Sequence, residues 1–295
     1  MTKTVWLFPG QGSQAVGMGA DLKDLPAAQA KLARADEILG WSVLDVCRGE
    51  ESQLARTLYT QPCLYAIASI LVDALAEGNL KPDFVAGHSL GEYVALYAAG
   101  VFDFESGLRL VKRRAELMDT AEGGKMVALL GFDREKLQDF IDKTDGVVLA
   151  NDNSDGQAVI SGTPEAVDAV VASVKTKKAV ALNVSGAFHS PLMAEAAQEF
   201  AALLEPIPFN DAAIPVLSNV DPTPCTEGAQ LKERLVKQMT GSVRWREIMA
   251  KLPELGVEKA VEIGPGQVLA GLLKRGYSAI ARENISSASD VAKVL

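Results

Sequence analysis

The chain has 295 residues, of which 48% are hydrophobic and 23% charged, and its formal net charge at pH 7 is −9. This composition predicts a folded protein with a large core, and the length fits one large domain or a main domain that carries a smaller one. The negative charge argues against a general nucleic-acid binder, which needs a basic surface.

The lengths of the apolar runs and the cysteine pattern predict a cytoplasmic protein. No run of 18 apolar residues occurs, so we expect no membrane span. The first apolar run, Val5–Phe8, has four residues before Pro9, which indicates a strand rather than a signal peptide. The three cysteines are scattered and form no C-x-x-C pattern, which predicts reduced thiols and no cysteine-based zinc site. They are Cys47, Cys63 and Cys225.

The first third of the chain alternates strand and helix patterns. The strand Val5–Phe8 runs into the glycine-rich loop Pro9–Gln14, which matches neither common nucleotide-binding pattern. We expect this loop to offer a main-chain N–H to a reacting group. Helices are predicted over 27–39, 53–58 and 63–75.

The next stretch predicts a strand, a sharp turn and a helix. Phe84–Ala86 is apolar, Gly87–Gly91 reads G-x-S-x-G, and Tyr93–Ala99 is apolar enough to pack on a sheet. This context is typical of a nucleophile elbow, in which Ser89 is exposed at a helix N-terminus. The alternative is a glycine turn with an incidental serine, because a bare G-x-S-x-G occurs by chance in roughly one chain in ten of this length.

An amphipathic helix is predicted over 104–118, and Arg114 lies close to its buried side. One interpretation is a guanidinium that reaches solvent from the helix edge, and position alone favours it. The other is a planar fork that binds a substrate carboxylate through two parallel hydrogen bonds.

The middle of the chain predicts a small inserted domain. The order βαββαβ is that of the ferredoxin-like unit, and a cleft between it and the elbow would suit a ligand. The elements are expected at 126–130, 133–144, 147–150, 157–161, 163–176 and 179–184. We predict a small domain over 124–187 and a large catalytic domain formed by 1–123 and 188–295.

The last hundred residues complete the large domain. Strands are predicted at 214–218 and 259–263, and helices up to 204 and at 231–239, 245–252 and 268–274. The tail from Tyr277 has no distinctive feature. The fold class is therefore α/β, with a hydrolase-like parallel sheet and the inserted ferredoxin-like domain.

Only two histidines are available to activate a serine. His88 directly precedes Ser89, so its side chain points elsewhere in an elbow and we interpret it as structural. His189 lies in a loop that can face the cleft, which makes it the expected general base. No acidic residue stands out as its partner, so a main-chain carbonyl is a serious alternative.

Five segments together resemble the malonyl-CoA:acyl-carrier-protein transacylases, in the order of that family and across nearly the whole chain. They are Phe8–Gln14, Thr60–Pro62, Gly87–Tyr93, Gly186–Ser190 and Glu262–Gly266. The length is similar to the stand-alone enzymes of type II fatty acid synthesis or those that act in trans on polyketide synthases. Residues 99–105 and 110–118 look closer to the trans-acting group.

The resemblance implies roles for the reacting groups. Ser89 would carry the malonyl group as an ester, His189 would be the base, and Arg114 would bind the malonyl carboxylate, which reverses the preference stated above. Main-chain N–H groups of Gln11 and Leu90 would form the oxyanion hole.

It also implies supporting groups. The main-chain carbonyl of Gln238 would hold the histidine, and the ring of Phe188 would disfavour a 2-methyl branch. The small-domain loop with Asn151, Asn153 and Gln157 would face the site. Departures from the family pattern are Ala115, Asp155 and Val94, and the first two put the exact acyl group in doubt.

The implied partners are malonyl-CoA and an acyl carrier protein, with no metal or redox cofactor, no nucleic acid and no membrane. Acidic carrier proteins would dock on local basic patches, for which Lys175–Lys178 and Lys274–Arg275 are candidates. Two alternatives remain: an acyl hydrolase of the same fold that clears carrier proteins, which would lack Arg114, and a non-catalytic carrier-binding scaffold, which would tolerate loss of Ser89 or His189.

Overall fold

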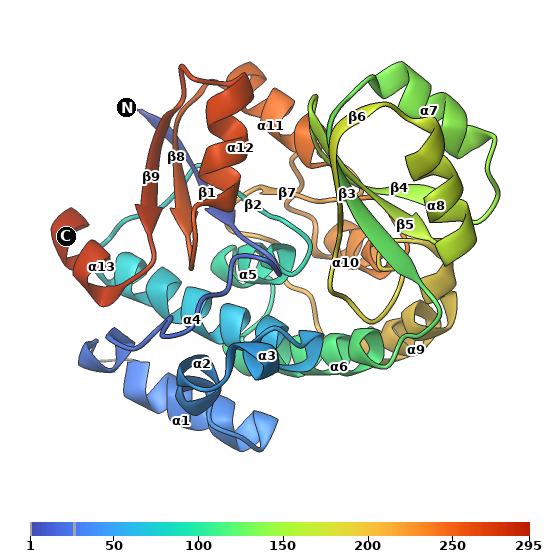
Figure 1. Ribbon diagram of the computed structural model, residues 1–295. Coiled ribbons are helices and arrows are strands. Elements are labelled where there is room, and N and C mark those ends of the chain that lie inside the picture. The colour runs from blue at the N-terminus through green and yellow to red at the C-terminus, as the bar shows by residue number, and fades with distance from the viewer. Residues whose placement is uncertain (1, 26–27) are drawn as a thin grey trace.

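The computed structural model describes residues 2–25 and 28–295. Position 27, where the first helix was expected to begin, lies outside this range. The expected α/β class is confirmed: the described residues form one parallel and one antiparallel sheet with helices around both (Figure 1).

The larger sheet has five parallel strands in the order β7-β2-β1-β8-β9. Its central strand β1 separates two layers of helices: Trp6 and Phe8 face one core, and Val5 and Leu7 face the other. The strands are β1 (Lys3–Phe8), β2 (Phe84–Gly87), β7 (Val216–Leu217), β8 (Val257–Ile263) and β9 (Ala281–Ile285).

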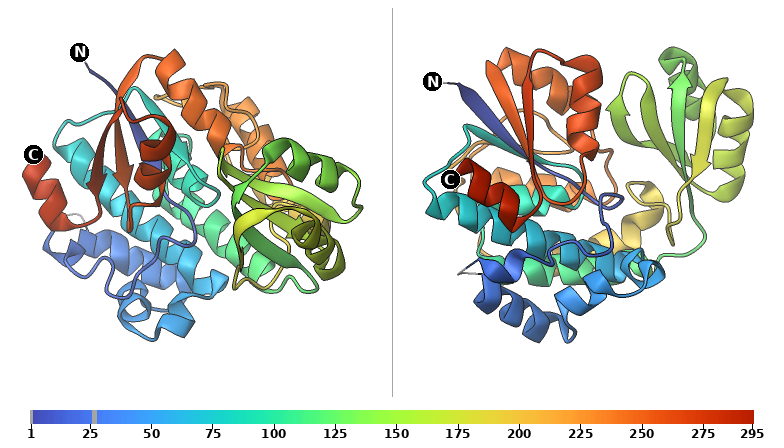
Figure 2. Two further views of the ribbon diagram at one scale, coloured as in Figure 1. Left: turned by 45° about the horizontal axis from the view of Figure 1, so that its top comes forward. Right: turned by 60° about the vertical axis from the view of Figure 1, so that its left-hand side comes forward.

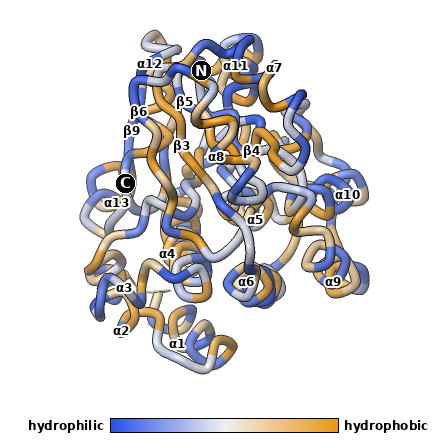
Figure 3. Tube along the Cα trace, turned by 45° about the vertical axis from the view of Figure 1, so that its right-hand side comes forward, coloured by the Kyte–Doolittle hydropathy of each residue, from blue (hydrophilic) through white to orange (hydrophobic). Residues whose placement is uncertain are grey.

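The helices of the larger unit pack on both faces of this sheet (Figures 1 and 2). Amphipathic helices such as α6 and α9 alternate hydrophobic and hydrophilic residues (Figure 3). The helices are α1 (Ala28–Leu39), α2 (Val43–Arg48), α3 (Glu51–Leu54), α4 (Thr57–Glu77), α5 (Gly91–Ala98), α6 (Phe104–Asp119), α9 (Ala194–Leu204), α10 (Gly228–Gln238), α11 (Trp245–Glu254), α12 (Val268–Gly276) and α13 (Ala288–Val294), with short 3-10 turns at Leu22–Asp24 and Pro191–Met193.

Helix α4 is the central helix of the first core. It is the one helix of the described residues that is long and apolar enough to cross a membrane, but 83% of its apolar window is buried inside the protein. Its apolar character therefore reflects packing in the core.

The smaller sheet has the order β4-β5-β3-β6 and is antiparallel. It consists of β3 (Lys125–Phe132), β4 (Val147–Ser154), β5 (Gln157–Gly162) and β6 (Thr176–Ala181), covered by α7 (Arg134–Asp142) and α8 (Pro164–Ser173). This order is that of a ferredoxin-like unit, and it encloses a hydrophobic cluster of its own. The right-hand view of Figure 2 shows it beside the larger sheet. The boundaries 124 and 187 stay a prediction.

Two sequence expectations were wrong, and one region had no predicted element. Residues 53–58 do not form one helix, because Arg56 is extended and separates α3 from α4. The strand expected at 214–218 pairs only over Val216–Leu217. The region beyond Tyr277, for which no element was predicted, forms edge strand β9 and helix α13.

Candidate active site

The elbow is built by close approach of two glycines. A Cβ added at Gly87 would overlap the main chain of Gly91, and one at Gly91 would overlap the carbonyl of Phe8. Between them Ser89 has a φ of 51°, a left-handed conformation that is unfavourable for a side chain with a Cβ. The tight turn places Ser89 immediately before α5, at the carboxyl end of β2.

His189, which follows Ser89 by 100 residues in the sequence, contacts this serine. Its Nε2 lies 2.8 Å from Ser89 Oγ. Its Nδ1 lies 2.9 Å from the main-chain carbonyl of Gln238 and 3.2 Å from that of Gly241. Because carbonyl oxygens can only accept, Nδ1 must carry the proton, which leaves Nε2 free to accept the serine proton.

The electrostatics keep this imidazole neutral. Burial, and after it the nearby positive charge of Arg114, lower the pKa of His189 to about 3. The carbonyls of Gln238 and Gly241 oppose this shift because they favour the protonated ring. His189 is therefore an unprotonated base at neutral pH.

Arg114 is fully buried on the inner face of α6 and faces the serine. Its Nη2 donates to Ser89 Oγ at 3.0 Å, and its Nη1 donates to Gln61 Oε1 at 2.8 Å. No carboxylate of the described residues forms an ion pair with it, and its Nε has no partner there. Burial lowers the pKa of Arg114, but a guanidinium keeps its proton. The site therefore holds a buried cation without a directly paired anion, which is costly unless a ligand supplies one.

Two N–H groups point to an oxyanion hole. Among the hydrogen bonds of the described residues, none uses the main-chain N–H of Gln11 or of Leu90. The N–H of Ser89 itself is taken by Asn219 Oδ1 at 2.7 Å. Gln11 lies in the loop after β1, and Leu90 begins the helix after β2, so both follow neighbouring parallel strands.

Ser89, His189 and Gln11 line a cavity of about 200 Å³ between the two sheets. From the larger unit it is lined by the loop Gly10–Ser13 and by Ser89, Phe188 and His189. From the smaller unit it is lined by Asn151, Asn153 and Gln157. The cleft therefore brings all three loop residues named from the sequence to the serine.

His88 does not point at the reacting atoms. Its Nε2 lies 2.8 Å from Asn153 Oδ1, and burial lowers its pKa. Asn153 is thus engaged with His88 as well as facing the cavity. Arg113, the neighbour of Arg114, pairs with Glu116 and Glu199 at the surface.

Two departures from the family pattern lie away from the cavity lining. Ala115 is buried and Asp155 is 93% exposed, and neither lines the cavity. Sequence reasoning also missed the parts played by Gln61 and Asn219. The available signal for Asn219 was its place just after a short strand, where the ends of parallel strands meet.

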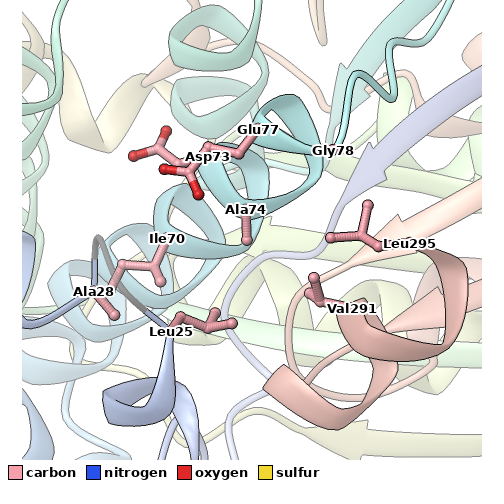
Figure 4. A pocket seen from close by; sticks show the side chains of 9 residues that line it. All are labelled: Leu25, Ala28, Ile70, Asp73, Ala74, Glu77, Gly78, Val291 and Leu295. Atoms are coloured by element: carbon pink, nitrogen blue, oxygen red, sulfur yellow. The ribbon is translucent and has the colours of Figure 1, made fainter.

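A second hollow, between α4 and α13, has different chemistry (Figure 4). Its acidic side chains are Asp73 and Glu77, and the rest of the labelled lining is apolar or glycine. It offers no nucleophile with a base, so the cavity at Ser89 is the candidate active site.

A serine with a neutral histidine base, two free N–H groups and a buried cation defines a serine acyl-transfer site on an α/β fold. The model of the acyl transferase domain family matches residues 5–294, and the chain belongs to this family.

The names of individual relatives are more specific than the family description. The chain is 56% identical over 289 residues to a malonyl CoA-acyl carrier protein transacylase of Synechocystis sp., covering 98% of this chain and 99% of the relative. The crystal structure of the Synechocystis transacylase matches with a TM-score of 0.97 over 99% of both chains. A polyketide biosynthesis transacylase of Bacillus velezensis is 42% identical over 92% of this chain and 95% of its own. A malonyl-transacylase solved in complex with a type II polyketide acyl-carrier protein matches with a TM-score of 0.93 at 37% identity, covering 100% of this chain and 99% of that chain.

Proposed function

We propose that this protein transfers a malonyl group from malonyl-CoA to the phosphopantetheine thiol of an acyl carrier protein. The observation that carries the proposal is Arg114, a fully buried guanidinium 3.0 Å from the Ser89 hydroxyl and without a carboxylate partner among the described residues. A substrate with a free carboxylate two bonds from its thioester carbonyl supplies the missing anion and places its carbonyl at the serine.

In the first half-reaction Ser89 Oγ attacks the thioester carbon while its proton passes to His189 Nε2. The carbonyl oxygen becomes an oxyanion between the N–H groups of Gln11 and Leu90. The carbon–sulfur bond then breaks, and His189 returns the proton to the departing thiolate of coenzyme A. The product is a malonyl ester of Ser89.

In the second half-reaction the carrier thiol gives its proton to His189, and its sulfur attacks the ester carbon. The carbon–oxygen bond to Ser89 breaks, and the serine recovers its proton from His189. Both halves are redox-neutral, and one base handles the proton in each direction, so the proposal requires no metal or redox cofactor.

Carrier docking is proposed on the basic side of the cleft. Lys177, Arg246 and Arg275 line a hollow of about 500 Å³ between the two units. Leu272 borders both this hollow and the serine cavity, and Arg275 donates to Gln157 Oε1 at 3.3 Å. Arg246 pairs with Asp152. A phosphate on an acidic carrier would therefore meet the positive charges of Lys177 and Arg275 next to the serine cavity.

The pathway can be fatty acid or polyketide synthesis: the Bacillus velezensis relative is named for polyketide biosynthesis, and the name of the Synechocystis relative gives no pathway. We place the protein in the cytoplasm, where both substrates occur, and its three cysteines are free and buried. The hydrolase alternative is not favoured, because the relatives are named transacylases and Arg114 is present.

The experiment is intact-mass measurement of the protein after malonyl-CoA is added, followed by addition of an acyl carrier protein. Transfer predicts a stable malonyl adduct that disappears as malonyl-carrier forms. Rapid loss of the adduct to water before carrier is added would support the hydrolase, and no adduct would leave a scaffold.

A further inference from the structure

Glu92 is a buried carboxylate to which the mechanism above gives no part. It lies in the first turn of α5 and is 1% exposed. Burial raises the pKa of Glu92, whereas the hydrogen bonds it accepts and the positive charge of Arg114 lower it. No ion pair of the described residues involves it. A buried carboxylate without a directly paired cation lowers the stability of the fold, so its presence calls for a functional explanation.

Glu92 accepts hydrogen bonds from two residues that in turn hydrogen-bond to the main chain of the reactive serine. Its Oε2 accepts from Gln238 Nε2 at 2.7 Å and from the main-chain N–H of Asn219 at 3.1 Å. Gln238 Nε2 also donates to the main-chain carbonyl of Ser89 at 2.9 Å, and Asn219 Oδ1 accepts the Ser89 N–H at 2.7 Å. Both polar main-chain groups of Ser89 are therefore held by partners of one carboxylate.

The carboxylate also helps to fix which way the Gln238 amide faces. A carboxylate only accepts hydrogen bonds, so the amide must turn Nε2 toward Glu92 and Ser89. Its oxygen then faces Arg114, whose Nη2 lies 3.3 Å away. Without the acceptor at residue 92, Nε2 keeps only the Ser89 carbonyl as an acceptor, and the amide is held less firmly.

This support matters because the serine conformation is strained. A non-glycine residue with a φ of 51° persists only where the surroundings hold it. A small rotation of the Ser89 main chain would move Oγ away from His189 Nε2, at present 2.8 Å distant.

We propose that Glu92 is a positioning residue, which acts through Gln238 and Asn219 to hold the Ser89 main chain so that Oγ points at His189. The inference rests on the proposed function only in naming Ser89 as the reacting group. Oε2 makes both contacts, while Oε1 has no partner among the described residues. The hydrogen bonds that Oε2 accepts therefore do the positioning.

The test compares Glu92→Gln, which keeps an acceptor oxygen, with Glu92→Leu, which removes it. The first readout is the rate at which phenylmethylsulfonyl fluoride modifies Ser89, measured by intact mass per folded molecule. The second is kcat and KM for malonyl transfer. Glu92→Leu should slow sulfonylation and lower kcat by roughly 10- to 100-fold, as expected for a misaligned nucleophile. KM for malonyl-CoA should change by less than about threefold because Arg114 remains, and Glu92→Gln should stay within about threefold of the wild type.

The matched control is Glu262→Leu, which removes another 1%-exposed carboxylate that accepts main-chain N–H groups, here those of Leu269 and Ala270. It should lower the melting temperature without slowing sulfonylation of Ser89. If Glu92→Leu does not fold, Gln238→Leu removes the other end of the same bond and should slow sulfonylation equally.

The inference is overturned if Glu92→Leu, or Gln238→Leu in its place, reacts like the wild type, if Glu92→Gln is as slow as Glu92→Leu, or if Glu262→Leu slows the serine to the same degree. Sulfonylation needs no malonyl substrate. A wild-type protein that reacts with the sulfonyl fluoride but transfers no malonyl group would therefore contradict the proposed function and leave this test intact.

Discussion

Replacing Arg114 with methionine removes the buried cation while keeping an unbranched side chain of similar length. The malonyl carboxylate would then enter a site that offers no positive charge. Loss of one partner of a buried charged pair costs about 3–4 kcal/mol, which corresponds to a fall of roughly 10²- to 10³-fold in kcat/KM. Acetyl-CoA has no carboxylate, so its transfer should change by less than about tenfold. The protein should unfold at a similar or higher temperature, because Arg114 is fully buried without a paired anion.

The assay follows malonyl and acetyl transfer to a carrier protein by mass spectrometry, together with thermal unfolding. Arg113→Met is the matched control, since Arg113 is the next residue along α6 and pairs at the surface with Glu116 and Glu199. Its malonyl kcat/KM should stay within about twofold of the wild type, as for exposed ion pairs. Equal losses of malonyl and acetyl transfer in Arg114→Met would refute a carboxylate-binding role for this residue.

The lowered pKa of His189, about 3 in place of 6.5, predicts that kcat/KM stays level as pH falls through 6.5. A bound malonyl carboxylate offsets the charge of Arg114 and so raises the pKa of His189 in the enzyme–substrate complex. The acid limb of kcat should therefore lie at higher pH than that of kcat/KM. An acid limb of kcat/KM near pH 6.5 would contradict the lowered pKa of His189. Since the unfolded chain binds the proton first, His189 also costs stability as pH falls from 6.5 toward 3, by at most about 1.4 kcal/mol per pH unit, which urea unfolding across pH measures. Phe188→Ala should raise transfer of methylmalonyl relative to malonyl several-fold in a competition assay, and an unchanged ratio would show that the ring does not select. Lys177→Glu with Arg275→Glu should raise KM for the carrier but leave Ser89 acylation by malonyl-N-acetylcysteamine, which has no phosphate, unaltered; equal effects on both would argue against docking at this hollow.

Local pattern was enough to predict the elbow and the small sheet. The strand expected at Phe84–Ala86 ends one residue later in the structure, and the glycines around Ser89 signalled a sharp turn because no other residue fits there. The βαββαβ order likewise follows from short alternating segments, each with its own periodicity.

Contacts between distant segments could not be predicted from the residues alone. Gln61, Arg114 and Gln238 lie on three different helices, and only packing of α4, α6 and α10 brings them together. The strand β9 was missed because an exposed edge strand needs no apolar alternation, and its pairing with β8 decides its conformation. Arg56 shows the same limit at short range, since a single extended residue divides two helices within a continuous helical pattern.

The central claim is that malonyl passes through an ester on Ser89. Brief exposure of the protein to malonyl-CoA, followed by peptide mass mapping, tests it most directly. The account predicts malonyl on the peptide that contains Ser89, loss of that label when carrier protein is added, and no label in Ser89→Ala. Malonyl found on another residue, or label that persists in Ser89→Ala, would contradict it.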